Sequence, residues 1–153
     1  MHTTLIRRVV VDAARNRLIT SSDDKTVRVW QMPEGRLLKV LRIPIDGGHE
    51  GQVFGLAVSP DGRTVAAAGW TGWDWEGRGS IYLLDVATGD LVKRFGNLPE
   101  TVSAMMWSPD GRYLAVGLQG RGGFHVLRAD TGEIVASDPA YNDKLLDLDI
   151  SPQ

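Results

Sequence analysis

The residues that could do chemistry are few, and their spacing argues against catalysis. The sequence has no cysteine, which excludes disulfides, thiolate metal sites and a cysteine nucleophile. Its three histidines, His2, His49 and His125, stand far apart in the chain, and none has a nucleophile and an orienting acid at a spacing that would make a catalytic group. The sequence therefore predicts a protein that is not an enzyme and that holds no metal or cofactor.

Two further candidates have simpler explanations. Asp147 and Asp149 share one face of a short strand, as paired acid–base carboxylates would, but an isolated pair is more typical of a solvated face. The glycine-rich segment 117–123 is similar to a phosphate-cradling loop, yet such loops lead into a helix, and here a strand follows. We expect neither to be a site.

One segment concentrates aromatic and charged side chains and is the best candidate for binding. The loop of residues 70–79 holds three of the five tryptophans, and its residues of interest are Trp70, Trp73, Asp74, Trp75, Glu76 and Arg78. Aromatic residues beside arginine on an exposed loop are the composition of protein-interface hot spots and of sugar-stacking sites. Two interpretations stay open: the loop binds a partner, or its tryptophans fold down over the rim as a local plug.

A basic cluster near the N-terminus consists of Arg7, Arg8, Arg15 and Arg17. Strict alternation in a strand would send Arg7 and Arg8 to opposite faces, and no aromatic residues are interleaved as in proteins that bind single strands. A net charge of −2 also argues against a surface built for nucleic acid or an anionic membrane. The expected partner is a protein.

Short apolar runs bounded by turn residues predict an all-β fold. The connectors Pro-Asp-Gly and Ala-Thr-Gly suit hairpin turns because Asp and Gly accept the positive φ that such turns require. No ten-residue stretch combines helical periodicity with a cap. The expected strands cover residues 5–11, 17–21, 26–31, 36–41, 53–59, 64–69, 80–85, 90–95, 101–108, 113–118, 123–128 and 133–137.

These strands repeat as a unit. Ser59–Arg63 recurs as Ser108–Arg112, and apolar residues follow each unit start at offsets of 4, 7 and 9. The units start at residues 2, 49, 98 and 141, spaced by 47, 49 and 43 residues. Four short antiparallel strands repeated every 40–50 residues are typical of propeller blades.

The motifs resemble those of the WD-repeat propellers over essentially the whole chain. Gly48-His49 is followed by Ser59-Pro60-Asp61-Gly62, and the first unit carries Asp24-Lys25-Thr26-Val27-Arg28-Val29-Trp30. The resemblance implies that His2, Thr20, Asp24 and Trp30 form the structural hydrogen-bond network of this family. The second unit keeps only His49, beside Ala67 and Leu84, and the third has Leu98, Ala115 and Leu127.

The repeat count predicts an incomplete ring. Blade 1 is expected over about residues 2–45, blade 2 over 49–96 and blade 3 over 98–140, with the first strand of a fourth blade in 141–153. A closed ring needs at least four blades, and an open arc would leave apolar faces exposed on its end blades. We expect either part of a larger propeller or a half-ring completed by homo-oligomerisation.

These observations together favour a non-catalytic protein-interaction scaffold. The loop of residues 70–79 would share a rim with the connection of residues 43–52 and with the loop of residues 119–123, which contains Arg121. Segment 48–85 is similar to repeat regions of large bacterial multidomain proteins, and the N-terminus lacks a secretory pattern, which favours the cytoplasm. His125 is expected to be solvated, on the outward side of a third strand.

Overall fold

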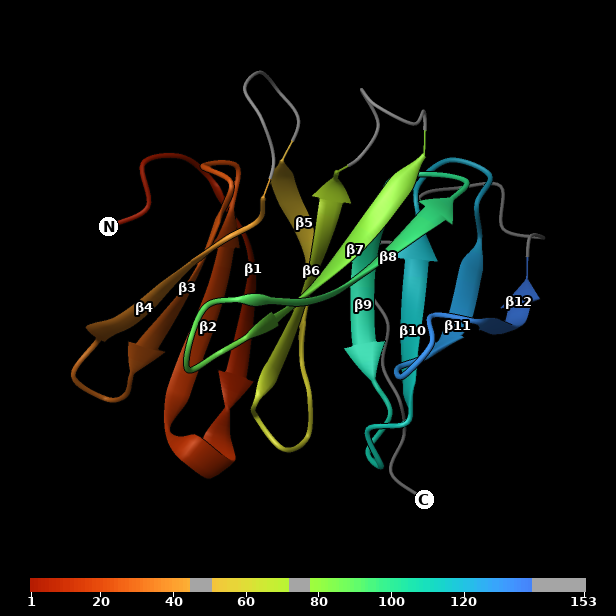
Figure 1. Ribbon diagram of the computed structural model, residues 1–153. Helices are drawn as coiled ribbons and strands as arrows, with labels where there is room; N and C mark the ends of the chain where they lie inside the picture. Colours follow the sequence, from red (N-terminus) through yellow and green to blue (C-terminus); the bar gives the residue numbers. More distant parts are fainter. Residues whose placement is uncertain (45–50, 72–77, 139–153) are drawn as a thin grey trace.

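The computed structural model describes residues 1–44, 51–71 and 78–138. These residues form three antiparallel sheets of four strands each (Figure 1). The strands, in chain order, are β1 (Ile6–Asp12), β2 (Arg17–Ser22), β3 (Thr26–Gln31), β4 (Arg36–Arg42), β5 (Gln52–Val58), β6 (Thr64–Trp70), β7 (Gly79–Asp85), β8 (Leu91–Leu98), β9 (Val102–Trp107), β10 (Tyr113–Leu118), β11 (Phe124–Arg128) and β12 (Ile134–Asp138). The predicted all-β fold of four-stranded blades is confirmed.

Most strand limits agree with the sequence prediction to within one or two residues because the turn motifs end each strand. In the turn between β5 and β6, the Ser59 hydroxyl donates to Asp61 Oδ1 at 2.6 Å, and the Arg63 N–H donates to the same oxygen at 3.0 Å. Gly62 adopts a φ of +66°, which an L side chain rarely adopts. The turn from Ser108 to Arg112 repeats these bonds. One turn of 3₁₀ helix, Ala13–Arg15, joins β1 to β2.

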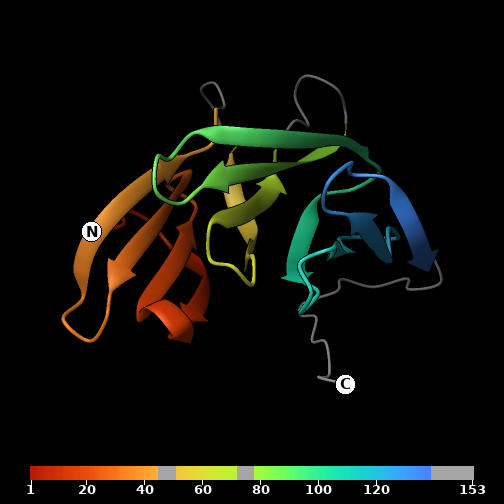
Figure 2. The same ribbon diagram turned by 60° about the horizontal axis from the view of Figure 1, so that its bottom comes forward.

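The sheets stand side by side as blades of an open arc (Figures 1 and 2). In each blade the first strand is innermost, and β5 contacts both β1 and β9 along the inside of the arc. One apolar core, which includes Ile19, Val29 and Leu84, lies between blades 1 and 2. A second core, which includes Leu83 and Leu114, lies between blades 2 and 3. The described residues do not close a ring.

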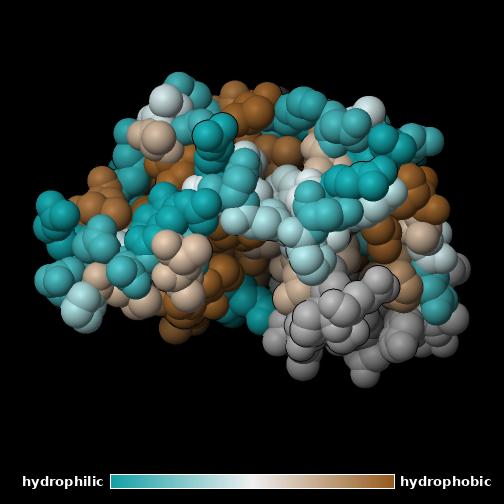
Figure 3. All heavy atoms as spheres, turned by 90° about the horizontal axis from the view of Figure 1, so that it is seen from below, coloured by the Kyte–Doolittle hydropathy of each residue, from teal (hydrophilic) through white to brown (hydrophobic). Residues whose placement is uncertain are grey.

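Blade 1 shows what an uncovered blade face looks like. Its apolar residues at offsets 4, 7 and 9 from the unit start at residue 2 are Ile6, Val9 and Val11, which are 53%, 55% and 57% exposed. The same positions of blade 2 are covered by blade 1, where Leu56 is 3% exposed. Seen from below, apolar atoms reach the surface in several separate patches among polar ones (Figure 3). The exposed apolar face predicted for an end blade is therefore present on blade 1.

Two details of the sequence interpretation are wrong. Strand pairing aligns Trp30 with Leu18, Leu84 with Val65 and Leu127 with Leu114. In blade 1, Thr20 stands two residues after the partner of Trp30. The equivalent residue is Ala67 in blade 2, as predicted, but in blade 3 it is Val116 and not the predicted Ala115. The predicted first strand of a fourth blade, in residues 141–153, lies outside the described residues.

The position of His125 is the second error. His125 pairs with Val116 on β10, so its side chain shares the face of Leu127 and Val116, which packs against blade 2. Both ring nitrogens are buried, and neither has a hydrogen-bond partner among the described residues. The face that was expected to meet solvent meets the preceding blade, and His125 is half-buried there.

Candidate functional site

A β-bulge interrupts the innermost strand of every blade at the same repeat position. The pairing skips one residue between Ile6 and Arg8, between Val53 and Gly55, and opposite Gly117 and Leu118. The residues at these bulges are Arg7, Phe54 and Ser103, each five residues after its unit start. A bulge inserts one residue and re-aims its side chain, so three separate repeats direct a side chain to one place.

The three bulge residues line one cavity on the inside of the arc, of about 520 Å³. Its lining residues are Arg7, Arg8, Gln52, Phe54, Trp70, Ser103 and Gln119. They come from the beginnings of β1, β5 and β9 and from the ends of β6 and β10, which lie toward the upper edge of Figure 1. We call this hollow the rim cavity.

The rim cavity corrects the prediction that Arg7 and Arg8 point to opposite faces. Without the bulge, consecutive residues of a strand alternate. The extra residue in β1 breaks that alternation, and both arginines line the same cavity. The basic cluster therefore contributes two consecutive arginines, Arg7 and Arg8, to the lining of the candidate site.

An ion pair holds Arg7 in place. Its Nε donates to Asp23 Oδ1 at 2.7 Å, and its Nη2 donates to Asp23 Oδ2 at 2.6 Å. The guanidinium carbon also lies 5.3 Å from the centroid of the Phe54 ring, within cation–π range. The hydrogen bond to Asp23 raises the pKa of Arg7 above its ordinary value, which is already high. Arg7 is a permanently charged group that its neighbours orient.

The upper end of the second strand supplies the other repeated position. Asp23, Trp70 and Gln119 each stand five residues after the equivalent residues Leu18, Val65 and Leu114. Each lies on the same side of its blade as that blade's bulge residue: Asp23 binds Arg7, and Trp70 and Gln119 line the cavity with Phe54 and Ser103. The bulge residue and the residue at the end of the second strand thus form a pair in each blade. The pair is ionic in blade 1 (Arg7 and Asp23), aromatic in blade 2 (Phe54 and Trp70) and uncharged polar in blade 3 (Ser103 and Gln119).

Of the residues predicted for binding, Trp70 is the one described residue that lines the rim cavity. It ends β6, pairs with Gln52 and is 39% exposed. Arg78 and Arg121 are exposed on the neighbouring loops but are not among the lining residues. Trp73, Asp74 and Trp75 lie outside the described residues.

The sequence analysis missed Arg7, Arg8, Phe54 and Ser103 as residues of one site. A signal was present in the offsets of the apolar residues. Offsets 7 and 9 differ by two, as strand alternation requires, but offsets 4 and 7 differ by three. An odd spacing within a strand, where an even one is expected, indicates an inserted residue, and it occurs in each of the three units whose strands the structure describes.

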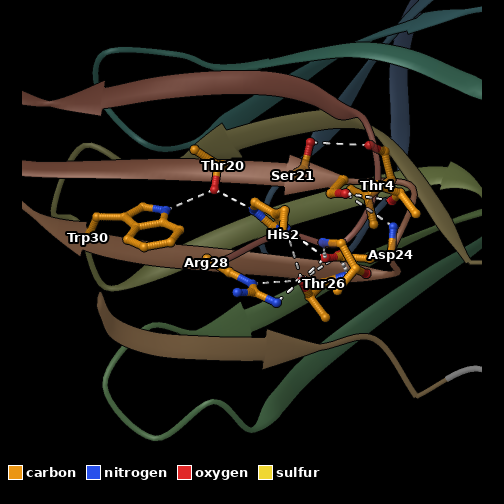
Figure 4. Close-up of polar contacts among 11 residues, drawn as sticks. His2, Thr4, Thr20, Ser21, Asp24, Thr26, Arg28 and Trp30 are labelled. Carbon is orange, nitrogen blue, oxygen red and sulfur yellow. Dashed lines mark hydrogen bonds and ion pairs between the residues drawn. The ribbon is translucent and has the colours of Figure 1, made fainter. Parts of the chain in front are cut away.

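A second polar cluster joins His2, Thr20, Asp24 and Trp30 in blade 1 (Figure 4). His2 Nε2 and Thr20 Oγ1 are 2.6 Å apart, and His2 Nδ1 and Asp24 Oδ2 are 2.9 Å apart. The Trp30 indole N–H donates to Thr20 Oγ1 at 2.9 Å. This chain of hydrogen bonds ties the segment before β1 to β2, to β3 and to the turn between them.

Asp24 is the centre of this cluster. Burial alone would raise its pKa, but hydrogen bonds from Thr26, His2 and the Thr3 N–H outweigh burial and lower the pKa to about 2. Arg28 Nη2 lies 3.6 Å from the same carboxylate. Within the part of the chain that the structure describes, the partners of Asp24 lie in blade 1 or in the segment before β1, so the cluster stabilises the blade. The predicted equivalent in blade 2, His49, lies outside the described residues.

The lower rim has a hollow of about 810 Å³ between blades 1 and 2. Arg15, Arg17 and Arg63 line it together with Asp61 and Asp85. Arg17 donates to the Gly62 carbonyl at 2.7 Å and to Asp12 at 2.6 Å. Since these charges are matched and bridge two blades, we assign this hollow to blade packing.

Within residues 1–44, 51–71 and 78–138, no three His, Asp or Glu side chains gather closely enough to hold a metal ion. No helix in the same ranges has the length and apolar character needed to cross a membrane.

Comparison with known proteins identifies the repeat. The family model for the WD domain, G-beta repeat, matches residues 1–31, 35–75 and 89–123. Coronin-7 of Bos taurus is 33% identical over 140 residues, which cover 91% of this chain and 14% of coronin-7. A ribosome biogenesis protein WDR12 homolog of Chlamydomonas reinhardtii is 38% identical over 71 residues, 39% of this chain and 15% of that protein. Protein HIR1 of Cryptococcus neoformans is 33% identical over 69 residues, which cover 44% of this chain and 8% of HIR1.

The chain thus spans only about a tenth to a seventh of the length of the coronin-7 relatives. The three matches of the repeat model cover β1 to β3, then β4 to β6, then β8 to β10, so the second and third each begin with the last strand of the preceding blade. The sheets have the strand order expected for propeller blades. The chain belongs to the WD-repeat family.

Proposed function

We propose that the chain is a non-catalytic protein-interaction scaffold whose upper rim binds a partner protein. One observation carries the proposal: three repeats direct their bulge residues, Arg7, Phe54 and Ser103, into a single cavity that Arg8 and Trp70 also line. Tryptophan and arginine are the residues most enriched at energetic hot spots of interfaces. A rigid frame of sheets also lowers the entropic cost of holding these side chains in place.

The binding surface of this proposal includes the loops beside the cavity. It comprises Trp70, Trp73, Asp74, Trp75, Arg78 and Arg121, together with the cavity residues Arg7 and Arg8. The proposal places the chain within a larger multidomain protein, of the bacterial kind that the tryptophan-rich segment resembles. A cytoplasmic location, and the absence of nucleic-acid and membrane binding, stay predictions.

A triple substitution tests this function. The chain carrying Trp70→Ala, Trp73→Ala and Trp75→Ala should lose the proteins that the unchanged chain captures from cells, while its β-type circular dichroism persists. The matched control is Arg36→Gln, an exposed residue at the start of β4. Unchanged capture by the triple variant would contradict the proposal, and collapse of its fold would favour the plug interpretation.

A second function is favoured by the uncovered face of blade 1. Ile6, Val9 and Val11 occupy positions that the preceding blade covers in blades 2 and 3. We infer as the alternative that two copies close a ring by packing end blades together. Light scattering should then give a dimer whose mass falls to that of a monomer on Val9→Lys. A monomer at all concentrations would contradict this alternative.

A further inference from the structure

We propose that a hollow on the lower rim, between blades 2 and 3, binds an arginine side chain of a partner protein. The hollow has a volume of about 460 Å³ and is lined by residues of the β5–β6 turn and of the β9–β10 turn, at the lower edge of Figure 1. We call it the blade 2–3 hollow. It is separate from the rim cavity, so this inference does not depend on the function proposed for the upper rim.

The junction between blades 1 and 2 shows how this fold holds a guanidinium at the lower rim. Arg17, the first residue of β2, donates from Nη2 to Asp12 Oδ2 at 2.6 Å and to the Gly62 carbonyl at 2.7 Å. Its side chain is 15% exposed. One guanidinium thus joins a carboxylate of its own blade to a turn carbonyl of the following blade.

The repeat places Thr64 at this position in blade 2. Arg17 and Thr64 each begin the second strand of their blade, one residue before positions that the strand pairing makes equivalent. The facing glycine of the next turn is Gly111, which stands in its Ser-Pro-Asp-Gly motif where Gly62 stands in the earlier one. Both Thr64 and Gly111 line the blade 2–3 hollow. The guanidinium that joins the first two blades therefore has no counterpart from the equivalent position of the second junction.

The acceptors of the junction are kept. Ser59 stands in the place of Asp12, and its hydroxyl donates to Asp61 Oδ1 at 2.6 Å, so Asp61 supplies the carboxylate of this turn. On the facing turn, Ser108 donates to Asp110 Oδ1 at 2.5 Å. These hydrogen bonds lower the pKa of both carboxyl groups below the ordinary value, so both are charged at neutral pH. The Oδ2 atom of each accepts no hydrogen bond from a described residue.

The amine among the described lining residues is already engaged. Lys93 lines the hollow, and its ammonium donates to the Asp130 backbone carbonyl. The Asp130 carboxylate pairs with Arg128, 3.3 Å from its Nε. Lys93 is thus tied to the β11–β12 turn and does not take the part that Arg17 plays between blades 1 and 2.

The lining favours an arginine over a lysine. The planar fork of a guanidinium can bind a carboxylate and still offer a donor to a carbonyl, as Arg17 does, whereas an ammonium is a point charge. Trp107 and Val92 form an apolar part of the lining, and Val92 is 53% exposed. The methylene stem of arginine packs on such a surface, and its guanidinium is attracted to an indole face.

Supplying the guanidinium from within the chain is the first test. In Thr64→Arg the side chain starts from the position equivalent to Arg17, and we expect it to reach Asp61 and Gly111 across the hollow. The melting temperature should be about 2–4 °C higher than that of the control Thr64→Met, which adds apolar volume without charge. A Thr64→Arg variant no more stable than Thr64→Met would overturn the inference.

Titration with a small probe is the second test. Amide NMR spectra of the whole chain are recorded with N-acetyl-arginine amide and with N-acetyl-citrulline amide, which has nearly the same shape but no charge. We expect the arginine probe alone to shift the backbone amides of Asp61, Gly111 and Ala129, in the unchanged chain and in the surface control Arg36→Gln. Thr64→Arg should lose these shifts, because its own side chain fills the hollow.

The outcomes separate this inference from the function proposed for the upper rim. Equal shifts with both probes, or shifts that persist in Thr64→Arg, would overturn the binding of arginine in the blade 2–3 hollow. Capture of a partner through the upper rim should be the same for Thr64→Arg and for the unchanged chain. A failure of that capture in the unchanged chain would contradict the proposed function and not this inference.

Discussion

Asp24 shows how one buried carboxylate organises a blade. It accepts hydrogen bonds from the Thr26 hydroxyl at 2.6 Å and from two backbone N–H groups, and it lies 2.9 Å from His2 Nδ1. The match of residues 2, 20, 24 and 30 to the motif of the WD-repeat family is what implied that these side chains meet. Blades 2 and 3 carry apolar residues such as Leu84 and Leu127 at the position of Trp30, and both are buried in the cores between blades.

Replacing this carboxylate should destabilise blade 1. Asp24→Asn keeps the size of the side chain but turns an NH₂ group toward donors, so we expect the free energy of unfolding to fall by about 1–3 kcal/mol. The measurement is urea denaturation at pH 7. The control is Asp130→Asn, since Asp130 pairs with Arg128 in a fully exposed position. Equal stability of Asp24→Asn and the unchanged chain would contradict the role given to this cluster.

The same carboxylate makes stability depend on acid. Its folded-state pKa, about 2, lies below the ordinary value of 3.8, so the folded state binds fewer protons than the unfolded state between these values. The stabilisation by Asp24 is complete above pH 3.8 and is lost as the pH falls through that window toward 2. This part of the acid sensitivity should be absent from Asp24→Asn, and its persistence there would assign it to other groups.

His125 should add a dependence on pH nearer to neutrality. Burial lowers its pKa below the ordinary 6.5, because the charged ring loses its hydration. The groups beside it, Val116 and Ser137 across the sheet and the apolar core of blades 2 and 3, carry no charge. The unfolded state therefore binds a proton first as the pH falls below 6.5, and stability decreases.

The difference between the unchanged chain and His125→Leu isolates this effect. Chemical denaturation at pH 7.5 and at pH 5.5 should show a smaller loss of stability in the variant. An equal loss in both would mean that His125 finds a proton-accepting partner in the folded protein.

At the scale of the strand, bulges connect the fold to its site. The strands themselves were predictable because Ser-Pro-Asp-Gly turns and apolar alternation mark their ends. The direction of Arg7, Phe54 and Ser103 was not predicted, since alternation was assumed to be continuous along each strand. A single inserted residue per strand decides which side chains enter the rim cavity.

Gly69 allows the bulge of blade 2 to form. A Cβ atom at this position would lie 2.1 Å from the Gln52 carbonyl oxygen and 2.7 Å from the Phe54 nitrogen, both backbone atoms that cannot move aside cheaply. Gly69→Ala should therefore separate β5 from β6 near the cavity, with a loss of stability of about 2–4 kcal/mol and loss of partner binding.

Gly55→Ala is the matched control for this substitution. Its added Cβ would meet only side-chain atoms, at 3.1 Å from Val102 and 3.4 Å from Met105. Thermal unfolding of both variants should show the larger decrease for Gly69→Ala. If Gly55→Ala proved the more damaging, packing between blades rather than the bulge would be the sensitive feature.

At the scale of the whole molecule, the repeat count and the blade order were predictable, and the composition of the site was only partly so. The tryptophan-rich loop drew attention to the upper rim, and Trp70 lies there beside the cavity. Arg7 and Arg8 come from another blade, more than 60 residues away in the chain. Arg7, Arg8 and Trp70 line the same cavity because of how blades 1 and 2 pack together, and no local sequence pattern encodes that packing.

The most direct test of this account is hydrogen–deuterium exchange of the whole chain with and without a partner bound at the upper rim. We predict simultaneous protection of three separate segments, at residues 5–8, 52–55 and 102–104, since all three contribute to the rim cavity. The turns at residues 59–63 and 108–112, on the opposite rim, should be unchanged. Protection confined to those turns, or to the uncovered face of blade 1, would contradict the account.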